Sequence, residues 1–179
     1  RYLTESIDVA SQATPMLKFR EMGITEPLSN LILGNVAGSL GEACAILIIL
    51  AGLYLIYKKV ASWQIMAAVF IGFTVTNTAF YLLGSPSIPN PLFGILSGGF
   101  LFGMVFMATD PVTAPKTKEG KWIYGILIGI VTVVIRGYAL FAGGMMFAIL
   151  VGNTFAPLID EIVKYIKSSR KEKRKEVAA

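Results

Sequence analysis

The chain has no histidine and a single cysteine, Cys44. It therefore lacks the commonest ligand for zinc, copper and haem, and it cannot form an internal disulfide. Charged residues make up only 15% of the 179 positions. The sequence also lacks the phosphate-binding pattern GxxxxGK[ST], the dinucleotide pattern GxGxxG, a CxxC pair and a Ser–His–Asp arrangement. These absences argue against a metal site built from this chain alone and against soluble enzyme chemistry, and we assign no catalytic residue.

Hydrophobic residues, by contrast, make up 55% of the chain, and the mean hydropathy is +0.67. This composition predicts an all-α integral membrane protein. Five hydrophobic runs approach or exceed the ~17–25 residues that cross a bilayer, so we expect about five transmembrane helices. They lie at residues 31–57, 63–83, 92–108, 122–135 with flanks, and 144–159. The fourth is short unless it continues past Arg136, whose side chain would then point at protein or at the interface.

The first run is too long for one straight span, because a helix over residues 28–57 would measure about 45 Å. It contains GNVAGSLGE at residues 34–42, which ends on the acidic Glu42. We expect a broken or re-entrant segment followed by a span that starts near Glu42. Non-helical backbone at membrane depth is tolerated where it lines a cavity, whereas Gly34 and Gly38 could equally serve close helix packing. Further glycine pairs that predict close packing are Gly99 with Gly103 and Gly125 with Gly129.

The positions of lysine and arginine predict the orientation. Twelve of the sixteen fall in the loop after the first run, in the loop after the third run and in the C-terminal tail. Cytoplasmic loops carry this excess, so the C-terminus is expected in the cytoplasm and, with an odd number of spans, the N-terminal segment outside. The net charge of +5 arises in this tail, and nucleic acid is not an expected partner.

Three carboxylates fall within or next to the hydrophobic runs: Glu42, Asp110 and Asp160. A charge at bilayer depth costs several kcal/mol, which makes each one a candidate for an ion path. Asp110 and Asp160 lie near the expected cytoplasmic ends, where an interfacial carboxylate beside a lysine is an equal alternative. Asn77 and Asn153 are expected to hydrogen-bond between helices.

Several motifs, in this order, resemble those of a known family: SQAT, LILGNVAGSLGE, SGGFLFGMVFMATDP, GKWIYGILIGI and GGMMFAILVGNTFAPLID. The chain resembles the C-terminal half of two related membrane proteins. One is the B-type subunit of the sodium-pumping NADH:quinone oxidoreductase (Nqr), and the other is the D-type subunit of the Rnf ferredoxin:NAD complex. GNVAGSLGE is closer to Rnf, and KEGKWIYGILIGI is closer to the quinone reductase.

This resemblance implies half of a larger, repeat-built bundle in the bacterial cytoplasmic (inner) membrane. It also implies that the chain is part of an oxidoreductase of several subunits. Those other subunits and membrane lipid would be its partners.

The resemblance gives a meaning to DVASQATP at residues 8–15. In this family a threonine that ends such a motif carries FMN through a phosphoester bond, attached by a flavin transferase outside the membrane. Here that threonine would be Thr14, with Asp8, Ser11 and Ala13 as the recognised positions. Gln12 and Val9 depart from the usual small residues of the motif. Riboflavin or a second flavin could occupy a site shared with the missing half.

The expected organisation is a flavin-attachment segment at 1–27, a transmembrane bundle at 28–166 and a basic cytoplasmic tail at 167–179. Electron transfer through the flavin would be coupled to Na⁺ or H⁺ movement past the three carboxylates. Two alternatives remain. One is a channel or transporter without a redox cofactor, and the other is a scaffold protein that only organises its partners.

Overall fold

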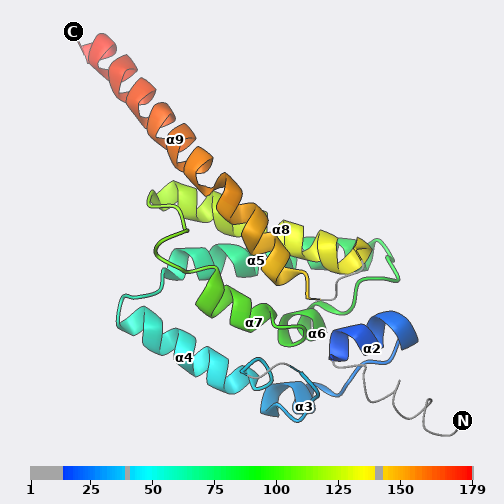
Figure 1. The fold of residues 1–179 in the computed structure, drawn as a ribbon. Coiled ribbons are helices and arrows are strands. Elements are labelled where there is room, and N and C mark those ends of the chain that lie inside the picture. The colour runs from blue at the N-terminus through cyan, green and yellow to red at the C-terminus, as the bar shows by residue number, and fades with distance from the viewer. Residues whose placement is uncertain (1–13, 39–40, 140–142, 179) are drawn as a thin grey trace, which may run out of the picture.

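The computed structural model describes residues 14–38, 41–139 and 143–178, and every element in this part of the chain is helical (Figure 1). The prediction of an all-α membrane protein is confirmed. In chain order, the elements are α2 (Pro15–Met22), α3 (Leu28–Leu33), α4 (Ala45–Tyr57), α5 (Trp63–Leu82), α6 (Pro91–Leu96), α7 (Phe100–Phe102), the π-helix η1 (Gly103–Met107), α8 (Lys118–Tyr138) and α9 (Met145–Ala178).

Three helices in the described residues are long and apolar enough to cross a membrane: α5, α8 and the part of α9 up to Arg170. They correspond to the second, fourth and fifth hydrophobic runs. The first and third runs are divided into shorter helices. The longest of these, α4, has 13 residues and measures about 20 Å, less than the ~30 Å hydrocarbon core of a bilayer.

The expected break in the first run is confirmed. Helix α3 ends at Gly34, whose φ of 86° is left-handed, and the next helix begins only at Ala45. Neither Gly34 nor Gly38 lies within a helix, so the alternative of helix packing through this pair is not observed. Residues 39–40 lie outside the described part of the chain.

The third run was predicted as one helix over 92–108, and this prediction is wrong. Helix α6 ends at Leu96, and the chain resumes helical structure at Phe100. Between them, Gly98 and Gly99 have φ values of 64° and 66°, which side chains other than glycine rarely adopt. Gly99 and Gly103 do permit close packing as expected, but not as a pair within one helix. Gly99 lies in the break against Glu42, and a Cβ atom at Gly103 would lie 2.5 Å from the side chain of Met145.

Helices α5 and α8 run parallel to each other, and α9 runs antiparallel to α8 (Figure 1). Trp63 packs on Trp122 near the start of α5 and α8, and Phe80 packs on Tyr138 near their ends. Because two consecutive long helices are parallel, the chain between them must return to its starting end. Residues 91–107 make that return, so the broken third run takes the place of the predicted third helix.

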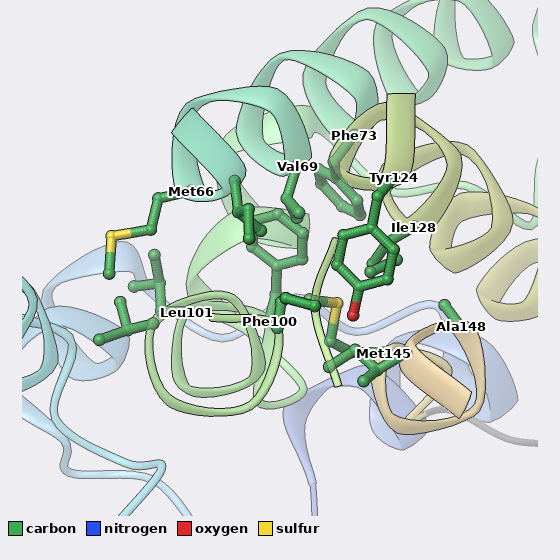
Figure 2. Packing of buried hydrophobic residues seen from close by; sticks show 14 of the residues in the cluster. Met66, Val69, Phe73, Phe100, Leu101, Tyr124, Ile128, Met145 and Ala148 are labelled. Atoms are coloured by element: carbon green, nitrogen blue, oxygen red, sulfur yellow. The ribbon is translucent and has the colours of Figure 1, made fainter. Parts of the chain in front are cut away.

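The core of the bundle lies where these helices meet. Figure 2 shows Phe73, Phe100 and Tyr124 filling the space between α5, α7, α8 and α9. The hydroxyl of Tyr124 donates a hydrogen bond of 2.6 Å to Asn153 on α9. Asn77 donates to the carbonyl of Pro89 at 3.1 Å. Asn153 thus joins two helices, as expected, whereas Asn77 joins α5 to the loop before α6.

Lysines of the described chain gather where α4 ends and where α5 and α8 begin, which we call the basic end. Lys167 on α9 bonds Glu119 on α8 there, at 2.6 Å. Helix α9 continues through residues 166–167 without interruption and projects beyond the bundle (Figure 1). The lysines that define this end are Lys58, Lys59, Lys116, Lys118, Lys121, Lys164 and Lys167.

We predict that Gly129→Ala destabilises the chain. A Cβ atom at Gly129 would lie 2.5 Å from the backbone nitrogen of Phe73 and 2.7 Å from the carbonyl oxygen of Val69. Such overpacking costs about 1–3 kcal/mol, which should lower the midpoint of thermal unfolding in detergent. Gly38→Ala is the control, because nothing lies within 4 Å of its Cβ position. Equal midpoints for the two variants would contradict close packing of α5 on α8.

Candidate functional site: two helix breaks and a buried arginine

The break between α6 and α7 is held by Arg136, which projects from α8. Its Nη1 donates to the carbonyl of Gly94 at 2.7 Å, and its Nη2 donates to those of Gly98 (2.7 Å) and Ser97 (3.2 Å). Arg136 is 3% exposed. The guanidinium therefore satisfies carbonyl groups at the end of α6 that have no partner within a helix.

Two aromatic rings complete the surroundings of this charge. The guanidinium carbon of Arg136 lies 5.5 Å from the ring centroid of Phe73 and 5.7 Å from that of Phe100. These are cation–π distances, at which the ring faces stabilise a desolvated cation. Of the two directions expected for Arg136, protein or the interface, the structure shows protein, but its attachment to the break was not foreseen. The signal in the sequence that could have indicated this attachment is a single arginine within a hydrophobic run, in a chain whose preceding run contains adjacent glycines.

The second break places Glu42 against the first. A Cβ atom built on Gly99 would lie 2.8 Å from the carboxyl carbon of Glu42. Only a residue without a side chain lets the two broken segments approach this closely. Arg136 binds the carbonyl of Gly98, and Glu42 stands against Gly99, so a basic and an acidic side chain approach adjacent residues of the same break.

Glu42 lines a cavity of about 120 Å³ together with Thr14, Gly98, Gly99 and the start of α9. Thr14 is the N-cap of α2, and its Oγ1 accepts a hydrogen bond of 3.4 Å from the backbone nitrogen of Leu17. Helix α2 is anchored by Met16, which packs with Leu31 and Phe93. The fold thus brings Thr14 and Glu42 to one cavity. Asp8, Ser11 and Ala13, the other predicted motif positions, lie outside the described residues.

Asp110 lies apart from this cavity, in the loop before α8. Its Oδ2 accepts a hydrogen bond of 2.9 Å from the Thr113 hydroxyl, and its Oδ1 accepts one of 3.3 Å from the backbone nitrogen of Val112. These bonds, that of Thr113 first, lower the pKa of Asp110 below its ordinary value. The carboxylate is therefore ionised at neutral pH and stabilises a turn.

Asp160 on α9 caps the N-terminus of α8 at the basic end. Its oxygens accept hydrogen bonds from the backbone nitrogens of Lys116 (2.8 Å) and Thr117 (3.1 Å) and from the Thr117 hydroxyl (2.6 Å). The negative charge is favourable at a helix N-terminus. Asp160 also lines an open cleft of about 630 Å³ between α9 and the loop before α8.

The three predicted carboxylates therefore do not form one site. Among the described residues, no three cysteine, aspartate or glutamate side chains gather as metal ligands would. Glu42 shares its cavity with Thr14, whereas Asp160 lies at the basic end and Asp110 in the loop before α8.

Comparison with known proteins identifies a family and several relatives of this chain. The model of the NQR2, RnfD, RnfE family matches residues 2–168. The B subunit of the Na(+)-translocating NADH-quinone reductase of Klebsiella pneumoniae (strain 342) is 43% identical over 85% of this chain and 38% of the relative. Its counterpart in Stutzerimonas stutzeri (strain A1501) is 48% identical over 73% and 34%. That of Haemophilus influenzae (strain PittEE) is 44% identical over 79% and 36%. The chain thus spans little more than a third of the length of these relatives.

We predict that Asp160→Asn loosens the basic end. The amide retains one acceptor and places donor hydrogens where Asp160 now faces N–H and O–H groups, at a cost of about 1–3 kcal/mol. The expected result is a lower thermal midpoint and faster proteolysis in the loop at 111–117. Glu161→Gln changes the neighbouring carboxylate and serves as control. If both variants unfold like the unaltered chain, the cap contributes nothing to stability.

Proposed function

Since the chain belongs to the NQR2, RnfD, RnfE family, we propose that it forms the C-terminal part of the membrane subunit of a redox-driven ion pump. In this proposal, a flavin on Thr14 relays electrons, and Na⁺ or H⁺ moves past carboxylates of the bundle. The observation that carries it is the shared cavity of Thr14 and Glu42. Other subunits of the complex, a flavin transferase and lipid would be the partners.

The proposed cofactor is FMN, joined through its phosphate to the Thr14 hydroxyl. Its attachment point fits the local structure, because the N-terminus of α2 favours negative charge and the N–H of Leu17 already points at this oxygen. The flavin would supply electron transfer, and the chain would hold and orient it. The cavity of about 120 Å³ is smaller than the ~300–1,000 Å³ pockets that enclose ligands. In this proposal the described residues would supply the attachment point but not an enclosure for the ring.

The proposed ion path uses carboxylate oxygens, which suit both a hard cation and a proton. Glu42 occupies the inner position at the meeting of the two breaks. Asp160, beside its open cleft, and Asp110 would belong to the basic end. We further propose that the basic end faces the cytoplasm of a bacterial inner membrane and that the segment before Thr14 lies outside. The gathering of seven lysines at one end supports this orientation.

A second candidate function is a channel or transporter without a redox cofactor. The observation that favours it is the contact between two broken segments at a carboxylate, since discontinuous helices commonly form transport sites. The two candidates differ in whether activity requires Thr14.

We predict that Thr14→Ala removes covalent flavin and abolishes turnover, while the complex still assembles. The test measures the intact mass of the protein and its in-gel flavin fluorescence after denaturation, from cells that also produce the flavin transferase. Thr25→Ala, which alters another threonine of the same segment, is expected to retain both. Flavin-free protein with unchanged ion transport would favour the channel or transporter.

We also predict that Glu42→Gln raises the Na⁺ concentration that gives half-maximal turnover. Loss of the carboxylate charge removes an ion ligand but leaves the flavin attachment intact. A control is Glu26→Gln, which changes a carboxylate paired with Lys18 at 2.9 Å. Steady-state rates over a Na⁺ series give the comparison. An unchanged Na⁺ dependence for Glu42→Gln would remove this residue from the path.

A further inference from the structure

Arg136 is a full positive charge within a helix long enough to span the membrane, and it is 3% exposed. Such a charge is costly at membrane depth, and arginine stays protonated there. Its hydrogen bonds go to three backbone carbonyls and to no carboxylate. The guanidinium is thus a permanent cation held by neutral oxygens.

Those oxygens belong to a particular place in the fold. Gly94, Ser97 and Gly98 lie at the C-terminal end of α6, where the helix breaks. In proteins that move ions, unwound carbonyls and the C-terminal ends of half-helices coordinate the transported cation. In this chain the same kind of oxygen cluster is already filled by a side-chain cation.

Glu42 approaches the same break. Its carboxyl group stands against Gly99 and lines the cavity, one residue along from Gly98, whose carbonyl Arg136 binds. A cation drawn to Glu42 would therefore meet a fixed positive charge bound to the adjacent residue of the break. In a low-dielectric surrounding, the repulsion between two nearby cations is large.

We propose that Arg136 is a cation barrier, which occupies the carbonyl end of α6 and stops ions that reach Glu42 from leaking through the break. The proposal rests on the proposed function in one respect, that ions reach Glu42. It does not depend on flavin at Thr14. Arg136 acts through its charge and its hydrogen bonds: it holds the break in position and keeps cations from passing through it.

The rival explanation is that Arg136 only holds the break together. Both explanations predict that its loss lowers stability, so stability does not separate them. Passive ion flux does, because a purely structural contact gives no dependence of flux on side-chain charge in the assembled complex.

The experiment uses the complete complex in vesicles of phosphatidylethanolamine and phosphatidylglycerol, with a Na⁺ gradient and no electron donor. Arg136→Gln is expected to raise passive Na⁺ flux by about tenfold, the factor that corresponds to ~1.4 kcal/mol of barrier. Arg136→Gln combined with Glu42→Gln should leak less, because the attracting charge is gone. Asn77→Leu, which removes another buried polar contact of the bundle, should not leak.

A pH series on Arg136→Lys tests the charge within one folded protein. A buried lysine loses its proton far more readily than arginine, so the flux should be low while the lysine is protonated and rise as the pH increases through its pKa. The unaltered protein should show no such rise. Within the described residues, Glu42 is the charged group that acts on this position. The packed elements α5 and α7 contribute Phe73 and Phe100, and α6 with the break contributes carbonyls.

Two results would overturn the barrier. One is an assembled Arg136→Gln complex that holds Na⁺ as tightly as the unaltered complex. The other is an Arg136→Lys flux that does not change with pH, which also decides the matter if Arg136→Gln fails to assemble. The flux measurement uses no electron donor and no flavin readout, so a failed flavin proposal and a failed barrier give different results.

Discussion

The hydrogen bonds from Arg136 to the carbonyls of Gly94, Ser97 and Gly98 are the contact on which the arrangement of the broken segments depends. A helix interrupted at membrane depth leaves polar backbone groups that lipid cannot satisfy. One guanidinium on α8 satisfies three of them and fixes α6 relative to the three long helices. The aromatic faces of Phe73 and Phe100 tie the same charge to the core.

Once the α6–α7 break is held, the other functional residues follow from close approach. Gly99 has no side chain, so Glu42 can rest against it and bring the first break to the second. Helix α2 packs through Met16 on Leu31 and Phe93, which sets Thr14 at the rim of the same cavity. The proposed cofactor attachment point and the proposed ion-binding carboxylate therefore share one cavity, beside the break that Arg136 holds.

The basic end has a different construction. There, the carboxylate of Asp160 binds the N-terminus of α8, and Glu119 binds Lys167 on α9. These contacts join antiparallel helices through charges that water can reach. Three carboxylates that looked alike in the sequence therefore differ in setting: Glu42 faces an inner cavity, Asp110 stabilises a turn and Asp160 caps a helix.

The sequence by itself determined the helical membrane class, the long spans and the first break, because hydrophobic run length and glycine content are local properties. For Arg136 it left two directions open, protein and the interface. It also identified Gly125 and Gly129 as sites of close packing, which the α5–α8 contact confirms. Only the tertiary structure decided the break at residues 97–99, the approach of Glu42 to Gly99 and the capping of α8 by Asp160. A glycine pair is compatible with a packed helix as well as with a break, and the choice depends on Arg136, which lies 42 positions away from Gly94. Contacts between such distant positions arise from packing, which no local pattern encodes.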